Sequence, residues 1–569
     1  MTNLEAREGN RLNDQLWANL AIQSCLDVGV DHFFLAPGSR CTPLTLAVAR
    51  QKTATVIQHF DERGLAFAAV GYARATGRPG VFICTSGTAV ANAFPAVIEA
   101  AMESVPMLLF TADRPLELRG SGANQTIDQQ NIFGRYAQLF LDMPAPEDQH
   151  AAADPGGRAF LGDALTRGMA AVKKGPVHFN WMFREPFTLK ENALEENAAG
   201  IWPDSNCNAN RDTDTAQPVS DCKIQLSGNV LIALGSCQVE EAREALKLAD
   251  RIQCPILSDV TSGLRTGSFE LPTECSLPVP DTILHLGGRI LSKTWHQWTA
   301  SLPSGQVKLI HVWAKDQNLN PQRLPIERYQ TSLTQLDQKI TAQRCDADFL
   351  AAWQRAAERR TSVIGQQLAD TKELSEPAVA FFVSQNCPSS MGLFLGNSTT
   401  IRDADWFGTQ ASDVPRRVAA NRGASGIDGL IATAVGYAAG LRTKTTVVLG
   451  DLSALHDLNS LSLVRGARWP MIVVLINNQA GHIFDLLPIR NSPHFEQYFA
   501  TTHDYQFEQA AKMFGLDYRI VTNMADFASG YQAALEQDQS VILEVMTDRQ
   551  VNLDVRNRIK SEIAKCHAS

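Results

Sequence analysis

Two residues with oxygen-bearing side chains follow two apolar segments late in the 569-residue sequence. Asp451 ends the segment TTVVLGD and Asn478 ends MIVVLINN, with a helix-length segment, SALHDLNSLSLVRGA, between them. The pattern predicts two buried strands, and a right-handed β-α-β connection would make them neighbours. A carboxylate, an amide oxygen and a backbone carbonyl from the next turn, of which Ala480 has the nearest, suit Mg²⁺. Alternatively, Asp451 caps the helix and Asn478 only forms a turn.

A second candidate lies far away in the sequence, in HFDERGLAFAAVGYARATG, where apolar neighbours suggest that Glu62 is buried. Glu62 follows the expected strand TVIQHF and begins an expected helix. A carboxyl group shielded from water has a raised proton affinity, which suits a residue that shares a proton with a ligand. The alternative is a glutamate at a helix N-terminus, stabilised there by the helix dipole.

These residues are carried by segments in which apolar runs, Gly/Pro/Ser loops and helix-period stretches alternate. Such alternation predicts an α/β fold of parallel sheets with the loops gathered at the carboxyl ends of the strands. We expect three α/β domains, at 1–195, 223–345 and 346–569, and a linker at 196–222, where the sequence is polar and lacks periodicity. The first and third domains have similar patterns without a visible sequence repeat.

Composition restricts the partners. The net charge of −9 argues against a general nucleic-acid surface, although it leaves room for local basic pockets. No apolar run is long enough to span a membrane, and the first residues lack the pattern of a signal peptide. The 11 cysteines form no C-x-x-C motif or zinc-ligand spacing, which fits a reducing compartment. We therefore expect a cytoplasmic protein that neither binds nucleic acid nor inserts into a membrane.

The spacing of Gly450-Asp451 and Asn477-Asn478 is similar to the Gly-Asp-Gly…Asn-Asn signature of thiamine-diphosphate enzymes, with Leu452 in place of the third signature residue. This resemblance implies a fold of three domains: one for the cofactor's pyrimidine, a middle one, and one for its diphosphate with Mg²⁺ or Mn²⁺. It also implies that Asp451, Asn478 and the Ala480 carbonyl hold the metal. Glu62 then matches the catalytic glutamate that hydrogen-bonds the cofactor's pyrimidine nitrogen N1′.

Further motifs narrow the resemblance to one family. The segments are APGSRCTPLTLA, HFDERGLAFAAVGYARATG, TSGTAVANAFPAVIEA, TADRPLELRGSGANQTIDQ, NRGASGIDGLIATAVG and NNQAGHIFDLLP. Together they resemble the 2-succinyl-5-enolpyruvyl-6-hydroxy-3-cyclohexene-1-carboxylate synthases, transferases of menaquinone and phylloquinone biosynthesis. The resemblance is dense in the first and third domains and thin in the middle one. It implies decarboxylation of 2-oxoglutarate and conjugate addition of the remaining four carbons to isochorismate.

The two substrates carry four carboxylates, which the planar fork of arginine can pair bidentately. The resemblance assigns substrate contacts to polar and basic residues in the motif loops: Ser39, Arg40, Arg114, Gln125, Ser398, Arg402 and Arg422. Taken singly, each arginine could instead be a surface group or a structural ion pair. Lys293 matches one half of a basic pair whose second position is Thr294 here.

Three apolar residues match positions that contact the cofactor. Ile427 matches the residue that holds the cofactor's two rings in a bent conformation, with ordinary core packing as the alternative. Ile483 and Phe484 match the wall beside the thiazolium ring. No histidine is assigned a role. In this superfamily the site forms between subunits, so the resemblance implies a homodimer or a dimer of dimers.

Three other functions agree less well with the sequence. Another thiamine-diphosphate enzyme, such as an acetolactate synthase, would not need four arginines for small substrates with one charge or none. A non-catalytic subunit would gain nothing from keeping both halves of a cofactor site. A dinucleotide oxidoreductase is disfavoured because G-x-G-x-x-G is absent and ALGSC resembles it only loosely.

Overall fold

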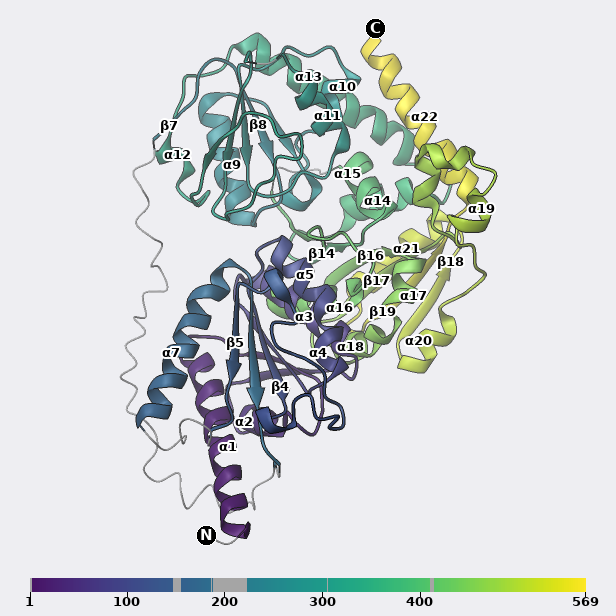
Figure 1. The fold of residues 1–569 in the computed structure, drawn as a ribbon. Helices are drawn as coiled ribbons and strands as arrows, with labels where there is room; N and C mark the ends of the chain where they lie inside the picture. Colours follow the sequence, from purple (N-terminus) through teal and green to yellow (C-terminus); the bar gives the residue numbers. More distant parts are fainter. Residues whose placement is uncertain are drawn as a thin grey trace. The chain divides into compact units, whose positions relative to one another are not determined.

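The computed structural model describes residues 3–146, 155–185, 187, 223–303, 305–409 and 414–568. Three large sheets contain only parallel strands, with helices between most successive strands (Figure 1). The expected α/β class with parallel sheets is confirmed. The expected linker, 196–222, lies outside the described residues.

The N-terminal sheet has six strands in the order β2-β1-β3-β4-β6-β5. Its strands are β1 (His32–Leu35), β2 (Thr55–Gln58), β3 (Gly80–Cys84), β4 (Met107–Asp113), β5 (Leu139–Met143) and β6 (Pro176–Met182). The helices along this part of the chain are α1 (Asn3–Asp27), α2 (Thr42–Ala49), α3 (Glu62–Thr76), α4 (Thr88–Asn92), α5 (Phe94–Met102) and α7 (Pro155–Ala171), with 3₁₀ turns η1 (Leu116–Leu118), η2 (Gly134–Tyr136) and η3 (Val172–Lys174). Strands β1, β3, β4 and β6 are buried along their whole length, as expected for central strands of a parallel sheet.

The middle sheet has five strands in the order β12-β11-β10-β8-β9. Its strands are β8 (Val230–Leu234), β9 (Ile256–Ser258), β10 (Thr282–Leu286), β11 (Lys308–Val312) and β12 (Glu327–Tyr329). A separate pair joins β7 (Ile224–Gln225) to β13 (Ile340–Thr341). The helices are α9 (Val239–Ile252), α10 (Leu271–Glu274), α11 (Lys293–Ser301), α12 (Leu336–Lys339) and α13 (Ala347–Leu368), with η5 (Val260–Ser262).

The third sheet has the order β15-β14-β16-β17-β19-β18, which is the order of the first sheet once its strands are renumbered from β14. Its strands are β14 (Gly392–Leu395), β15 (Arg417–Ala419), β16 (Thr445–Gly450), β17 (Met471–Asn477), β18 (Asp517–Val521) and β19 (Val541–Met546). The helices and 3₁₀ turns are α14 (Glu376–Asn386), α15 (Thr399–Phe407), α16 (Leu430–Leu441), α17 (Asp451–His456), η6 (Leu458–Ser460), α18 (Leu461–Gly466), η7 (His482–Leu486), η8 (Pro488–Asn491), α19 (Phe495–Tyr498), α20 (Glu508–Phe514), α21 (Met524–Glu536) and α22 (Arg549–Ala568). The expected likeness of the first and third domains is therefore a likeness of topology.

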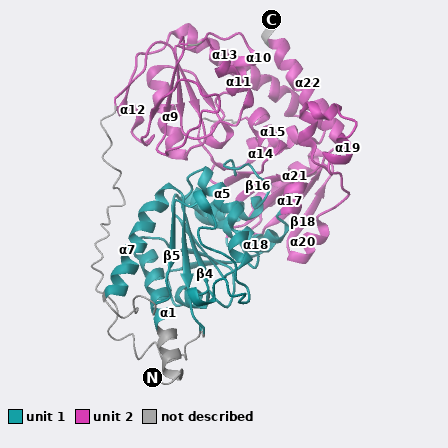
Figure 2. Cartoon of the chain, in the orientation of Figure 1, with its two compact units in different colours: residues 1–215, 421–442, 457–468 teal, residues 216–420, 443–456, 469–569 magenta. Residues whose placement is uncertain are grey.

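Contacts within the chain define two compact units (Figure 2). Unit 1 comprises Met1–Thr215, Asn421–Arg442 and Asp457–Arg468, and unit 2 comprises the rest of the chain. Two segments from the C-terminal third of the sequence, which include α16 and α18, thus belong with the N-terminal sheet. The expected domain boundaries at 195, 223 and 345 remain predictions.

Helices α3 and α16 of unit 1 are in close contact through small residues. A Cβ on Gly71 would lie 1.9 Å from the Thr433 carbonyl oxygen, and one on Gly436 would lie 1.8 Å from that of Ala68. Helix α3 begins at an Asp61 cap, whose carboxylate accepts the backbone N–H of Arg63, and ends at Gly77 in a left-handed conformation. The sequence of α3 is thus suited both to starting the helix and to its close contact with α16.

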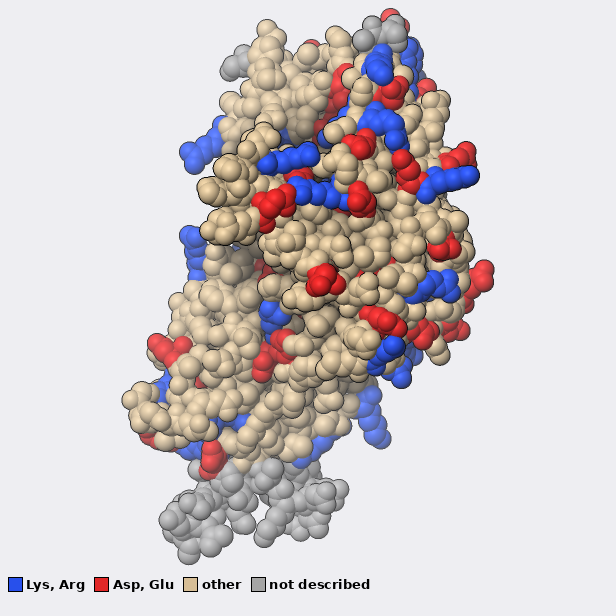
Figure 3. Space-filling view, turned by 90° about the vertical axis from the view of Figure 1, so that its right-hand side faces the viewer, with Lys and Arg blue, Asp and Glu red and all other residues tan. Residues whose placement is uncertain are grey.

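Acidic and basic side chains are interspersed on the face drawn in Figure 3, in keeping with the modest net charge of −9. None of the helices in the described ranges combines the length and the apolar character that crossing a membrane requires.

The contact between α3 and α16 predicts a stability effect. Gly436→Ala should destabilise the protein by about 1 to 3 kcal/mol, because the added methyl group overlaps a backbone oxygen that cannot move without shifting α3. Gly365→Ala in α13 is the control, since a Cβ there meets no atom within 4 Å and alanine favours a helix. Thermal unfolding should show a lower Tm for the first variant only; equal Tm values would contradict the close contact.

Candidate functional site

Asp451 and Asn478 follow neighbouring strands of the third sheet, at its carboxyl edge. Strands β16 and β17 pair in parallel, with Gly450 opposite Ile476. Asp451 is the first residue of α17, and Asn478 comes directly after β17, so each expected strand ends one residue earlier than predicted. The single expected helix between them is divided into α17, η6 and α18. The expected pairing of the two strands is present.

The Asp451 carboxylate is buried, with 2% of the residue exposed. Its Oδ1 accepts the backbone N–H of Leu452 at 2.6 Å, whereas its Oδ2 accepts no hydrogen bond from any residue that the structure describes. Nε2 of His503 lies 3.3 Å from Oδ2 without hydrogen-bond geometry. Burial raises the pKa of Asp451 to about 7. A buried carboxylate oxygen without a hydrogen-bond donor is suited to bind a cation, because the cation would stabilise the charged form of the carboxylate.

Asn478 is half-buried, and its amide is oriented by two hydrogen bonds. Its Nδ2 donates to Glu376 Oε1 at 2.6 Å, and its Oδ1 accepts the backbone N–H of Ala480 at 3.2 Å. Among the described residues no three His, Cys, Asp or Glu side chains gather as metal ligands. A metal here would therefore use one carboxylate with amide and carbonyl oxygens, a hard-oxygen set that fits Mg²⁺.

The other expected residues of unit 2 lie in three places. Ser398 and Arg402 follow β14; Ser398 has a φ of 70°, and its carbonyl accepts Nη1 of Arg402 at 2.5 Å. Ile483 and Phe484 are half-buried in η7, just beyond Asn478 in the chain. Lys293 begins α11 of the middle sheet and is exposed.

Glu62 lies at the first position of α3 in unit 1 and is half-buried in the single chain, so the burial that its apolar neighbours suggest is only partial there. The apolar residues that suggested burial are Gly64 to Ala73, which are buried, but Glu62 precedes them at the end of the helix. Its Oε2 accepts Nδ2 of Asn92 at 3.3 Å. The carboxylate thus remains accessible in the single chain.

Ser39 and Arg40 follow β1 in the same unit. Ser39 is exposed, whereas Arg40 is buried, with its guanidinium donating to the Phe183 carbonyl at 2.7 Å and to Glu185 Oε1 at 2.6 Å. Burial and the nearby charge of Arg114 lower the pKa of Arg40. Two guanidinium groups that repel each other in a partly desolvated place favour an anion, and Glu185 supplies one.

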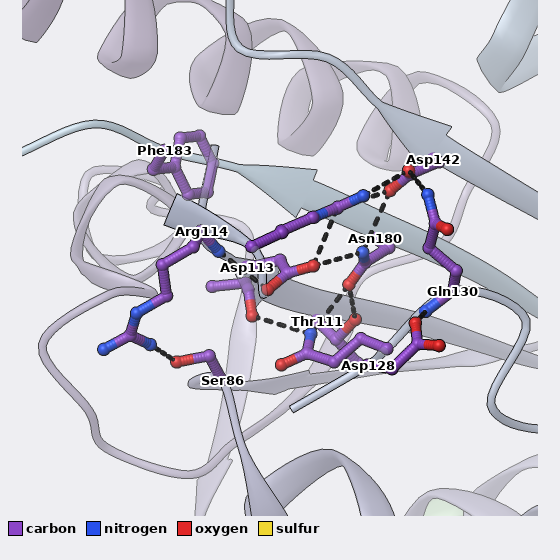
Figure 4. A network of polar contacts seen from close by, with 12 residues as sticks. Ser86, Thr111, Asp113, Arg114, Asp128, Gln130, Asp142, Asn180 and Phe183 are labelled. Carbon is purple, nitrogen blue, oxygen red and sulfur yellow. Dashed lines mark hydrogen bonds and ion pairs between the residues drawn. The ribbon is translucent and has the colours of Figure 1, made fainter. Parts of the chain in front are cut away.

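Arg114 follows β4 and holds two loops together. Its Nη1 donates to the Ser86 hydroxyl and, at 2.8 Å, to the Gln125 carbonyl. Gln125, an exposed residue with a φ of 54°, returns a hydrogen bond from Nε2 to the Ser86 carbonyl at 3.0 Å. The loops after β3 and β4 are therefore joined at Arg114 (Figure 4).

A buried polar network supports this junction (Figure 4). Asn180 of β6 is at its centre: its amide donates to Asp113 at 2.9 Å and Asp142 at 3.0 Å, and its oxygen accepts from Thr111 at 2.9 Å and Gln129 at 2.8 Å. Arg119 pairs with both carboxylates at 2.7 Å. Every hydrogen-bonding position of the Asn180 amide is used, so the network fixes the loop that carries Arg114.

Arg422 and Ile427 lie in the loop before α16, which belongs to unit 1. This loop is held by Glu99 of α5, whose carboxylate accepts the backbone N–H groups of Gly423 at 2.9 Å and Ala424 at 2.7 Å. Arg422 is half-buried, and Ile427 is 38% exposed. Core packing, the alternative weighed for Ile427, is therefore wrong within this chain.

Sequence reasoning missed several polar residues around these sites, among them the buried Glu376, Gln129 and Asn180 and the half-buried His503. Glu376 lies in LSEPAVA, which reads as an ordinary helix start, with Ser375 as cap and proline in the first turn. No local pattern indicates that Glu376 contacts Asn478, which is 102 residues away in sequence.

The network also predicts a pH dependence of stability. His178 of β6 is fully buried, and burial lowers its pKa from 6.5 to about 3. Its Nε2 bonds Thr111 Oγ1 at 2.7 Å, and its Nδ1 has no hydrogen-bond partner. Below pH 6.5 the unfolded chain therefore binds a proton at this residue that the folded chain does not. As the pH is lowered further, this difference reduces the free energy of unfolding of the wild type by about 1.4 kcal/mol per pH unit.

His178→Gln removes this proton linkage but also loses the Thr111 contact. The variant should be less stable than wild type at pH 7.5, and the difference should narrow as the pH is lowered to 5.5. Urea unfolding at the two pH values measures it. Parallel stability losses in both proteins would show that His178 does not bind a proton preferentially in the unfolded state.

Two family models match the chain. Residues 17–132 match the N-terminal thiamine pyrophosphate (TPP) binding domain of thiamine pyrophosphate enzymes, and residues 406–545 match the C-terminal TPP binding domain. The first range contains Glu62, and the second contains Asp451 and Asn478. The chain therefore contains both domains that bind thiamine diphosphate, another name for thiamine pyrophosphate.

Relatives cover nearly the whole chain. A 2-succinyl-5-enolpyruvyl-6-hydroxy-3-cyclohexene-1-carboxylate synthase of Rubrobacter xylanophilus is 38% identical over 97% of this chain and 99% of its own. Synthases of the same name from Pelodictyon phaeoclathratiforme and Salinibacter ruber are 35% and 34% identical, each over 97% of this chain and 96% of its own. The chain thus belongs to the 2-succinyl-5-enolpyruvyl-6-hydroxy-3-cyclohexene-1-carboxylate synthases, a family of thiamine-diphosphate-dependent enzymes.

Proposed function

We propose that the two sets of residues described above are the two halves of this family's active site. The observation that supports the proposal most is the buried Oδ2 of Asp451, which has no hydrogen bond within the described part of the chain. This oxygen lies at the same edge of the third sheet as Asn478. Asp451, Asn478 and the Ala480 carbonyl would hold Mg²⁺ or Mn²⁺, and the metal would bind the cofactor's diphosphate. In this assignment 1–195 binds the pyrimidine, 223–345 is the middle domain and 346–569 binds the diphosphate.

Glu62 is proposed as the catalytic carboxylate at the pyrimidine. When bound, thiamine diphosphate supplies the nucleophile and the electron sink for decarboxylation of 2-oxoglutarate. Glu62 would hydrogen-bond the ring nitrogen N1′ and share a proton with it, a task for which its place at the start of α3 leaves the carboxylate accessible. Ile427, Ile483 and Phe484 would contact the cofactor's rings; the exposure of Ile427 in the single chain supports this.

The substrates are small dianions, so basic residues are proposed as their contacts. Burial lowers the pKa of both Arg40 and Arg114, and the charge of Arg114 lowers the pKa of Arg40 further, which favours binding of a carboxylate. The remaining proposed contacts are Ser39, Gln125, Lys293, Ser398, Arg402 and Arg422. Decarboxylation of 2-oxoglutarate and addition of the remaining four carbons to isochorismate would give the family's product and CO2, for menaquinone or phylloquinone synthesis.

Purified protein with thiamine diphosphate, Mg²⁺ and 2-oxoglutarate should consume isochorismate and form a product of the expected mass. Glu62→Gln should lower kcat at least about 100-fold, because the variant cannot share a proton with N1′. Glu117→Gln, which alters a surface pair with Arg184 in the same unit, should keep wild-type activity. Decarboxylation of 2-oxoglutarate without loss of isochorismate would show that the proposed acceptor is wrong.

We further propose a homodimer, or a dimer of dimers, in which each site uses Glu62 of one subunit and Asp451 of the other. Support comes from Glu62, which is only half-buried in the single chain although a shared proton requires shielding. A cytoplasmic location fits the composition, in which cysteines lack disulfide or zinc spacing.

Complementation tests the shared site. A Glu62→Gln chain and an Asp451→Ala chain, each inactive alone, should regain about a quarter of wild-type activity when co-expressed, because half of the dimers are mixed and each has one intact site. The control is co-expression of Glu62→Gln with a chain that carries both changes, which contains no intact site in any dimer. No recovery in proven mixed dimers would place the whole site within one chain.

A further inference from the structure

Glu376 contacts a proposed metal ligand from the buried side. It is the first residue of α14, and 4% of it is exposed. Its Oε1 accepts Nδ2 of Asn478 at 2.6 Å. A carboxylate can only accept hydrogen bonds, so it selects the NH₂ group of the amide and turns the amide oxygen away.

Helix α22 fixes the Glu376 carboxylate. Nη2 of Arg556 donates to its Oε2 at 2.6 Å, and Arg556 also pairs with Asp403 of α15. Asn552, one turn earlier in α22, donates from Nδ2 to Oε1 at 3.1 Å and accepts the backbone N–H of Glu376 at 2.8 Å. Oε1 of Glu376 thus accepts hydrogen bonds from Asn478 and Asn552, and Oε2 accepts one from the charged guanidinium of Arg556.

We propose that Glu376, held by Arg556 and Asn552, is a positioning residue that sets the amide of Asn478 so that its oxygen, and not its nitrogen, faces the metal. This inference rests on the proposed function of Asp451 and Asn478. An amide that turned over would present NH₂ to a cation, so the hydrogen bond from Asn478 to Glu376 decides whether Asn478 can be a ligand.

The variant Glu376→Gln reverses this hydrogen bond. The guanidinium of Arg556 is charged and only donates, so it retains the oxygen of the introduced amide at the Oε2 position. The NH₂ group then takes the Oε1 position, where it faces the amide groups of Asn478 and Asn552. Asn478 must then either turn its oxygen toward that NH₂ group or lose the contact. We expect Mn²⁺ binding, in the presence of thiamine diphosphate, to weaken about 10- to 100-fold.

Adding Asn478→Asp should restore binding. In the double variant Glu376→Gln/Asn478→Asp, the NH₂ group of the introduced glutamine donates to one oxygen of the introduced aspartate, and the other oxygen faces the metal. The charge of the pair is unchanged. Asn478→Asp alone should bind Mn²⁺ more weakly than wild type, because two carboxylates would meet at the 2.6 Å contact. A merely structural role for Glu376 predicts no such rescue.

The chain provides a matched control one residue away. Asn477 Nδ2 donates to Glu544 Oε1 at 2.6 Å, and Asn477 Oδ1 accepts the backbone N–H of Gln479 at 3.1 Å. This pair copies the chemistry of Asn478 and Glu376, and both of its members are buried. Glu544→Gln should lower the Tm but leave Mn²⁺ affinity unchanged.

Free Mn²⁺ in titrations with full-length protein and thiamine diphosphate can be measured by electron paramagnetic resonance, beside a Tm for each variant. Weak binding by folded Glu376→Gln with rescue in the double variant supports the inference. Wild-type affinity in Glu376→Gln, or no binding by a folded double variant, overturns it; the double variant decides the matter if the single one does not fold. If wild type itself binds no Mn²⁺, the proposed metal site fails first and the inference fails with it.

Discussion

A carboxylate removed from water needs compensation, and Asp451 keeps one buried oxygen without a hydrogen bond. Nearby backbone N–H groups offset this burial only in part, His503 lies nearby without bonding the oxygen, and Glu376 adds a second buried negative charge. The sheet places Asn478 beside this oxygen because β16 and β17 are adjacent and parallel. The buried charge of Asp451, the neighbouring positions of β16 and β17 and the orientation of the Asn478 amide thus form one arrangement, which a bound cation would stabilise.

The first and third sheets repeat one strand order, and their proposed functional residues follow equivalent strands. Ser39 and Arg40 come after β1, and Ser398 and Arg402 come after β14, the equivalent strand. The loops after β3 and β4 meet at Arg114, whereas those after β16 and β17 carry Asp451 and Asn478. One topology thus carries proposed substrate contacts after strands of both sheets and the proposed metal ligands after strands of the third, as expected when ligands bind at the carboxyl ends of parallel strands.

The parallel sheets and the strand-end positions of several site residues were predictable from the sequence, because both depend on local sequence pattern. Alternating apolar runs predicted the parallel sheets, and the residues directly after them predicted the strand-end position of Asp451, Asn478 and Arg114. Partners from distant segments were not predictable: Glu376 reads as a helix start and Asn180 as a polar residue within a strand. The half-burial of Glu62 was also missed, since the apolar pattern of α3 describes the residues after it.

The packing of α3 on α16 bears on how the chain can be divided. The surface of α3 around Gly71 and Ala68 is covered by Thr433 and Gly436, which lie more than two hundred residues beyond the end of the N-terminal sheet. A fragment that stops after β6 would expose this glycine- and alanine-lined surface together with the buried carboxylate of Glu99, which lacks its backbone partners from Gly423 and Ala424. The N-terminal sheet is therefore contiguous in sequence, but the compact unit that contains it is not: the first third of the chain acquires its final packing only once Asn421–Arg442 is present.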